Sequence, residues 1–224
     1  MADLTRWSRA LVVVAHPDDE SFGLGAVLST LAERGTRVSV LCFTQGEAST
    51  LHGVEGDLSL LRREELRRAA DELGLDGVRL LAHPDGALAA EPAEVLLSEA
   101  RDYAAEVRPD GLLAFDPSGI TGHPDHRTAT WVAERLAAEL DLELLAWTLP
   151  AEVCEQLQRE LAVPFQGHSA DAIDVVVEVD RARQRRAIAC HESQAVPGSP
   201  LWRRLELLGD REHLRRLRRP ASAS

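Results

Sequence analysis

The chain has 224 residues, of which 45% are hydrophobic, and its formal net charge is −12. Such an acidic chain is a poor electrostatic partner for nucleic acid or for an anionic membrane surface, which argues against both kinds of partner. All 25 basic residues are arginine, which excludes Schiff-base catalysis and the lysine of a Walker phosphate-binding loop. The length and apolar content predict one domain over residues 1–224, with a main body at about 10–195 and a helical tail at about 200–219.

The sequence also bears on location. The apolar run Ala10–Ala15 is too short for the core of a signal peptide, and no stretch approaches the ~20 apolar residues of a membrane span. Cys42, Cys154 and Cys190 are odd in number and widely spaced, which predicts reduced thiols. These features predict a cytoplasmic protein without a membrane span.

Apolar periodicity predicts strands that alternate with helices along the chain. The predicted strands are 11–15, 37–43, 78–82, 111–115, 143–147 and 172–179. The predicted helices are 25–34, 58–73, 93–107, 124–140 and 180–190. Repeated strand–helix units predict an α/β fold, a single Rossmann-like doubly wound and mostly parallel sheet with helices on both faces.

The tail carries Leu201, Leu205 and Leu208 on one face of its predicted helix. An apolar stripe of this kind predicts that the helix docks onto the body of the domain. The same stripe is compatible with self-association, so a homo-oligomer is an open alternative.

Two similar polar motifs follow the first and fourth predicted strands. Each places a proline directly after a histidine and a second ligand-type residue three positions after it, His16 with Asp19 and His123 with His126. In a doubly wound sheet these two strands flank the point where ligands bind, so we expect the motifs to meet. Imidazole and carboxylate groups suit zinc, and a catalytic zinc ion takes three protein ligands and keeps one open position. The remaining polar groups are then free for acid–base chemistry.

We assign His16, Asp19 and His126 as metal ligands, Asp18 as the general base, and His123 as the group that faces the reacting carbonyl. The spacing equally permits His123 as a ligand and His126 as the catalytic group. It also permits Fe²⁺, Mn²⁺ or Co²⁺ in place of Zn²⁺.

Other polar residues are less informative. His83 begins a third His-Pro-Asp sequence, but it has Gly86 three positions later and is not assigned as a ligand. Glu20 and His191 are left without a role. The glycine-containing segment 45–58 is long enough to predict a lid over the metal. His52, His168 and His213 are given no role.

The two motifs closely resemble those of the PIG-L/LmbE-type zinc-dependent N-acetylglucosaminyl deacetylases. The resemblance covers about residues 10–195. The further segments that carry it are Thr44–Glu47, Arg62 with Glu65, Asp85–Gly86 and His191–Gln194.

The resemblance implies a Rossmann-like, zinc-dependent hydrolase that removes an N-acetyl group from an amino-sugar small molecule or glycoconjugate by attack of metal-activated water. It implies His16, Asp19 and His126 as the ligands and Asp18 as the base. It further implies that a protonated His123 stabilises the oxyanion and passes a proton to the departing amine, that Asp125 orients His123, and that Arg62 contacts substrate hydroxyls.

Alternatives remain within and outside this chemistry. One is an amidase on a related amino-sugar or thiol conjugate, and another is a deacylase that tailors antibiotics. A third is a metal-binding protein without catalysis. A nucleotide-binding Rossmann module is a fourth, but residues 15–25 lack its G-x-G-x-x-G fingerprint and place several acidic groups where a pyrophosphate would sit.

Overall fold

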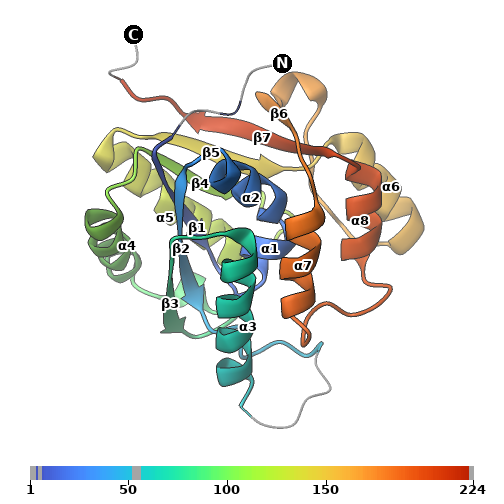
Figure 1. Cartoon of the computed structure of the whole chain (residues 1–224), viewed down its shortest axis with the longest axis horizontal. Helices are drawn as coiled ribbons and strands as arrows, with labels where there is room; N and C mark the ends of the chain where they lie inside the picture. Colours follow the sequence, from blue (N-terminus) through green and yellow to red (C-terminus); the bar gives the residue numbers. More distant parts are fainter. Residues whose placement is uncertain (1–3, 5–6, 52–56, 222–224) are drawn as a thin grey trace.

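The structure, a computed structural model, describes residues 4, 7–51 and 57–221. In this part of the chain seven strands form one sheet, in the order β3-β2-β1-β4-β5-β7-β6 (Figure 1). The strands are β1 (Arg9–Val14), β2 (Arg37–Thr44), β3 (Gly77–His83), β4 (Gly111–Phe115), β5 (Glu143–Thr148), β6 (Val175–Glu178) and β7 (Arg211–Arg218). The α-helices are α1 (Asp19–Phe22), α2 (Gly25–Glu33), α3 (Leu58–Leu73), α4 (Ala93–Val107), α5 (Pro124–Leu140), α6 (Ala151–Leu161), α7 (Ala182–Cys190) and α8 (Pro200–Leu208).

The five strands from β1 to β5 run parallel, which confirms the predicted α/β fold. Strand β1 pairs with β2 on one side and with β4 on the other. The chain therefore builds outward from β1 to β3 and then returns to build in the other direction, so the carboxyl ends of β1 and β4 are neighbours. This adjacency brings together two motifs that lie about a hundred residues apart in the sequence.

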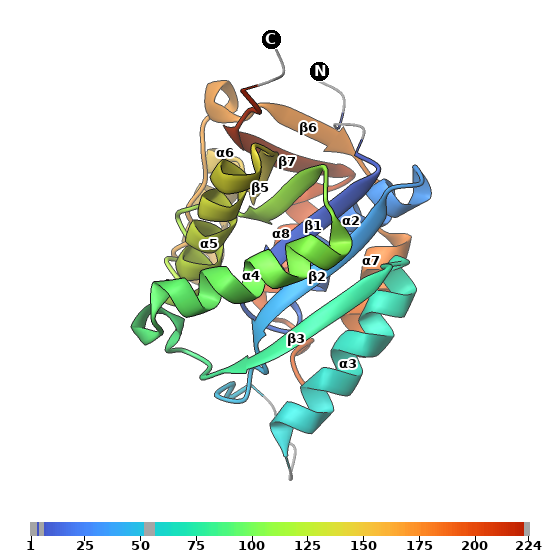
Figure 2. The same cartoon turned by 90° about the vertical axis from the view of Figure 1, so that its left-hand side faces the viewer.

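Helices cover both faces of the sheet (Figure 2). Helices α4 and α5 pack on one face around Leu11, Val13 and Leu112. Helices α2, α3, α6 and α8 contribute to the apolar core on the other face, around Val12 and Val14. Because successive residues of β1 point to opposite faces and both faces are covered, the strand is apolar at every position after Arg9 rather than alternating.

The predicted helical tail is wrong beyond residue 208. Helix α8 ends at Gly209, which has a φ of 57°, and residues Arg211–Arg218 form strand β7 instead. Strand β7 pairs antiparallel with β5 and with β6, so it closes an edge that β5 would otherwise leave open. Its Leu214 is fully buried, and this cross-strand packing outweighs the helical propensity of the arginines around it.

The leucine stripe of α8 docks as predicted. Leu201, Leu205 and Leu208 are all buried within the chain, so the stripe does not supply a surface for self-association. Among the residues that the structure describes, no helix has both the length and the apolarity to cross a membrane.

Candidate active site

The two polar motifs meet at a cavity of about 610 Å³ at the carboxyl ends of β1 and β4. The turn between β1 and α1 carries His16, Asp18 and Asp19 into it. The loop between β4 and α5 brings His123 from the other side, and the first turn of α5 brings His126. Proline follows each first histidine, and Pro124 occupies the first turn of α5, where the missing N–H costs no helical hydrogen bond.

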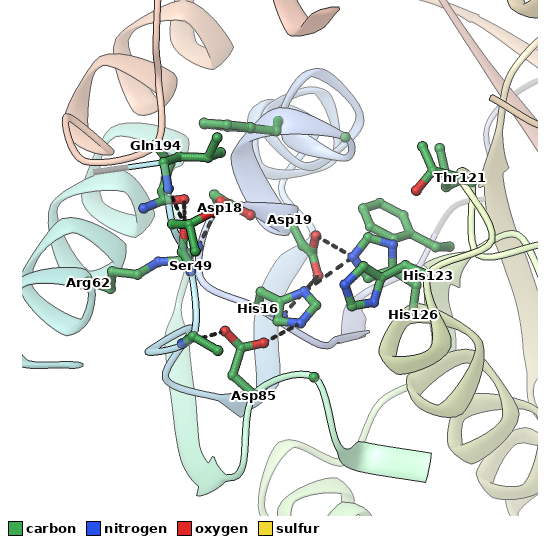
Figure 3. Close-up of a pocket in the computed structure, with 18 of the residues that line it drawn as sticks. His16, Asp18, Asp19, Ser49, Arg62, Asp85, Thr121, His123, His126 and Gln194 are labelled. Atoms are coloured by element: carbon green, nitrogen blue, oxygen red, sulfur yellow. Dashed lines mark hydrogen bonds and ion pairs between the residues drawn. The ribbon is translucent and has the colours of Figure 1, made fainter. Parts of the chain in front are cut away.

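Ligand-type atoms of three residues converge within this cavity, as Figure 3 shows. His126 Nε2 lies 3.2 Å from His16 Nδ1 and 3.1 Å from Asp19 Oδ1, and His16 Nδ1 lies 3.7 Å from Asp19 Oδ2. A tetrahedral zinc ion with bonds of about 2.0–2.1 Å needs its ligand atoms about 3.3 Å apart, so these residues fit the metal. A cation between the facing nitrogens of His16 and His126 would stabilise both, which agrees with a metal at this place.

Hydrogen bonds on the far side of each ligand fix its orientation. His16 Nε2 lies 3.2 Å from Asp125 Oδ2 and 3.0 Å from Asp85 Oδ1, which leaves Nδ1 free for a metal. His126 Nδ1 lies 3.2 Å from the carbonyl oxygen of Gly119, which leaves Nε2 free. Such partners set the imidazole tautomer and raise the basicity of the ligand.

The charges of this cluster are strongly coupled. Burial opposes the charged form of His16, but the hydrogen bonds to Asp125 and Asp85 outweigh it and raise its pKa to about 10. Burial likewise opposes the charge on Asp19, yet His126 and His16 hold the pKa of Asp19 well below its usual range. The cluster is thus a site where a carboxylate stays ionised beside two imidazoles.

Asp18 has an unusual backbone and a partly buried carboxylate. Its φ is 111°, a left-handed conformation that a residue with a Cβ rarely adopts, and its N–H donates to Glu20 Oε2 at 2.9 Å. Burial raises the pKa of Asp18 to about 6, although the charge of Arg62 opposes the shift. A carboxylate with such a pKa is suited to accept a proton near neutral pH.

Arg62 is held behind Asp18. Its side chain is 3% exposed, Nη1 donates to the carbonyl oxygen of Gly46 at 2.7 Å, and Nη2 donates to Asp18 Oδ2 at 2.7 Å and to the carbonyl of Pro17. Arg62 lines the cavity as expected, but both of its terminal nitrogens are taken by protein acceptors. In this geometry it positions the Asp18 carboxylate.

The carboxylate of Asp125 contacts His16 rather than the ring of His123. It also accepts N–H bonds from Gly86 at 2.7 Å and from Leu88 at 3.1 Å. His123 is positioned differently, because its Nδ1 accepts the backbone N–H of Asp125 at 3.2 Å. Burial, with the nearby charges of His126 and His16, lowers the pKa of His123, so its neutral form is favoured.

Residues 11–137 match the model of the family described as "PIG-L: GlcNAc-PI de-N-acetylase". The chain belongs to the PIG-L family. It is therefore a deacetylase-family enzyme, an amidohydrolase whose class of substrate is the N-acetylglucosaminyl compounds.

Two curated relatives and one solved structure are similar to this PIG-L chain. A 1D-myo-inositol 2-acetamido-2-deoxy-alpha-D-glucopyranoside deacetylase of Corynebacterium glutamicum strain R is 32% identical over 225 residues, covering 87% of the chain and 76% of the relative. A protein of the same name from Kineococcus radiotolerans is 33% identical over 149 residues, covering 53% of the chain and 41% of the relative. The fold is that of the zinc inhibited form of teicoplanin deacetylase Orf2, with a TM-score of 0.69, 20% identity and coverage of 93% of this chain and 97% of that one.

Several residues of the site were not assigned from the PIG-L motifs. Asp85 follows β3 and reaches His16, although it was given no role from the sequence. His191 Nε2 lies 2.7 Å from Glu20 Oε1, and both side chains are fully buried. The only signal for the latter pair was that each residue lies in a segment shared with the family.

Two of the histidines without an assigned role pair with carboxylates. His83 lies 2.6 Å from Glu99 and outside the candidate ligand cluster. His168 is tied to Asp116 at 3.0 Å. His52 and part of the predicted lid, residues 52–56, lie outside the described residues.

Proposed function

We propose that this chain removes the acetyl group from an N-acetylglucosaminyl small molecule or glycoconjugate, with Zn²⁺ held by His16, Asp19 and His126. The observation that carries the proposal is the convergence of ligand-type atoms from three residues at distances that suit a tetrahedral ion. The family membership supports the reaction class.

When bound there, zinc would polarise the amide carbonyl and lower the pKa of water toward ~7. Asp18 accepts a proton as water attacks the carbonyl carbon, and its pKa of about 6 suits that transfer. The C–N bond then breaks, the proton passes from Asp18 to the departing nitrogen, and acetate and a free amine are released.

His123 stabilises the negative charge that develops on the carbonyl oxygen. Because its Nδ1 accepts an N–H bond from Asp125, the neutral imidazole carries its proton on Nε2 and can donate from there. This role needs no net charge on His123, in agreement with its lowered pKa. Asp125 supports the reaction by orienting His16, and Arg62 by holding Asp18.

The test is release of free amine from a panel of N-acetylglucosaminides, including inositol and malate conjugates, by zinc-loaded protein. An Asp18→Ala variant is the control. We expect release by the wild type and almost none by the variant. Equal release by both proteins, or no release from any conjugate by zinc-loaded wild type, would contradict the proposal.

A further inference from the structure

Helix α8 contributes a buried arginine to the cavity from outside the residues that match the family model. Arg204 lines the same cavity as the two motifs, and it is 8% exposed. Its Nη2 donates to the carbonyl oxygen of Phe22 at 2.5 Å, while its buried Nε has no hydrogen-bond partner. Within residues 7–51 and 57–221, no carboxylate oxygen lies within 4.0 Å of its guanidinium.

The other arginines around this cavity are neutralised. Arg62, which also lines it, is paired with Asp18 at 2.7 Å. Arg181 is paired with buried Glu212. Arg204 is therefore the exception, and a buried charge without a counter-ion is costly unless another group compensates it.

The protein holds the Arg204 guanidinium in place without cancelling its charge. The guanidinium lies 5.1 Å from the centroid of the Trp147 ring, a cation–π contact, and Trp147 Nε1 is itself fixed by Glu212 at 2.7 Å. Burial lowers the pKa of Arg204 to about 10, so the group is still charged at neutral pH. A charged guanidinium that is fixed in place and has no carboxylate partner suits an anionic ligand.

A series of ring contacts connects Arg204 to the candidate metal ligands. Trp147, which the Arg204 guanidinium contacts, packs on Phe115 with ring centroids 5.4 Å apart, and Phe115 packs on His126 at 4.9 Å. Arg204 and His126 both line the cavity. A substrate whose acetamido group lies at His126 therefore presents a different part of the molecule to Arg204, and the anion that Arg204 fits belongs to that part.

We propose that Arg204 is a specificity residue that binds a carboxylate or phosphate group of the amino-sugar conjugate. The inference rests on the proposed function for the identity of the sugar, and it narrows the substrate class to conjugates that carry an anionic group away from the acetamide. A carboxylate and a phosphate offer the same pair of acceptor oxygens to the guanidinium fork, so the experiment separates them.

The test compares binding of three ligands by calorimetry in zinc-loaded protein: N-acetylglucosamine 1-phosphate, carboxymethyl N-acetylglucosaminide and neutral methyl N-acetylglucosaminide. An Asp18→Asn background prevents their consumption. We expect Arg204→Gln to raise the Kd of at least one anionic ligand about 10- to 100-fold more than the Kd of the neutral glycoside. This is the range for a lost charged hydrogen bond. Arg204→Lys should retain part of the preference, because it keeps the charge and loses the fork.

Arg203→Gln is the matched control, since Arg203 lies on the same helix but forms ion pairs with Glu160 and Glu206 on the surface. It should leave the preference unchanged. A preference for the phosphate or for the carboxymethyl ligand identifies which anion the site takes. Equal weakening of all three ligands by Arg204→Gln would show a purely structural role, and absence of any anion preference in the Arg204-containing protein would also overturn the inference.

The two proposals fail separately. If no conjugate is deacetylated but anionic ligands still bind through Arg204, the proposed reaction is wrong and the anion site stands. If all N-acetylglucosaminides are deacetylated with the same kcat/KM whatever their charge, the reaction stands and the anion site is wrong. Should Arg204→Gln not fold, Arg204→Lys and the ligand preference of the Arg204-containing protein still decide the question.

Discussion

At the scale of single residues, Asp18 combines a strained backbone with one contact to its backbone and one to its side chain. A non-glycine residue at a φ of 111° stores of order 1–3 kcal/mol, which the surroundings must offset. Glu20 accepts its N–H and Arg62 binds its carboxylate. These two contacts keep Asp18 in its strained conformation, with its carboxylate at the cavity beside the metal ligands.

Replacing Asp18 by asparagine tests its role as the base. An amide cannot accept the proton of the attacking water, so we expect kcat to fall by a factor of ~10²–10⁴, the usual contribution of a general base. Zinc content should not change, because Asp18 is not among the three converging ligands. The measurements are kcat and the molar ratio of zinc to protein. Activity close to that of the wild type would exclude Asp18 as the base.

The buried pair of Glu20 and His191 gives a stability prediction. Glu20→Ala leaves His191 buried without its partner and leaves the Asp18 N–H without an acceptor, so we expect the free energy of unfolding to fall by about 3–5 kcal/mol. Urea denaturation measures it. The control is Glu64→Ala, which removes an exposed ion pair with Arg67 and should change little. An equal effect of the two substitutions would contradict the interpretation.

At the scale of elements, the loop from β4 to α5 depends on Gly119. Its φ is 74°, and a Cβ there would lie 2.8 Å from the carbonyl oxygen of His123. The carbonyl oxygen of Gly119 also contacts His126 Nδ1 at 3.2 Å. The loop therefore couples its own backbone conformation to the orientation of a candidate metal ligand.

Gly119→Ala should consequently weaken zinc binding. We expect the Kd for zinc to rise by about 10- to 100-fold, as for other lost partners of a ligating histidine. Competition with a chromophoric chelator measures the Kd. Gly35→Ala is the control, because Gly35 has a φ of 88° but nothing within 4 Å of the added Cβ and lies in the loop before β2. An unchanged Kd in Gly119→Ala would show that the loop does not orient His126.

The local patterns of the sequence were sufficient to predict most elements. Helices over 58–73 and 93–107 have the predicted bounds, since regular apolar spacing and flanking turn residues mark them. Strand β7 was missed because only pairing with β5 makes its arginine-rich segment extended. Arg204 was missed for the same kind of reason, since no local pattern tells an arginine without a counter-ion from those on a charged surface.

The sequence was sufficient to predict which residues gather at the site. It was not sufficient to predict which of their side chains contact one another. His16, Asp19 and His126 converge because similar His-Pro-Asp motifs follow two strands that the topology makes neighbours. The contact between Asp125 and His16 depends on side-chain directions across the cavity. Spacing along the chain does not encode those directions.

At the scale of the whole molecule, the candidate metal site joins the two halves of the sheet. His16 and Asp19 follow β1, while His126 lies on α5 after β4. An ion bound by all three would cross-link segments more than a hundred residues apart in sequence. Because these ligands do not converge in the unfolded chain, zinc binding should stabilise the folded state.

Thermal unfolding with and without zinc tests this linkage. At a free zinc concentration 100-fold above Kd, we expect about 2.7 kcal/mol of stabilisation and a rise in Tm of roughly 5–10 °C for a chain of this size. Chelation should reverse the rise, and His126→Ala should abolish it. His83→Ala is the control, since His83 begins the similar His-Pro-Asp sequence after β3 but pairs with Glu99. A zinc-dependent rise that persists in His126→Ala would place the ion elsewhere, because the remaining two ligands cannot join β1 to β4.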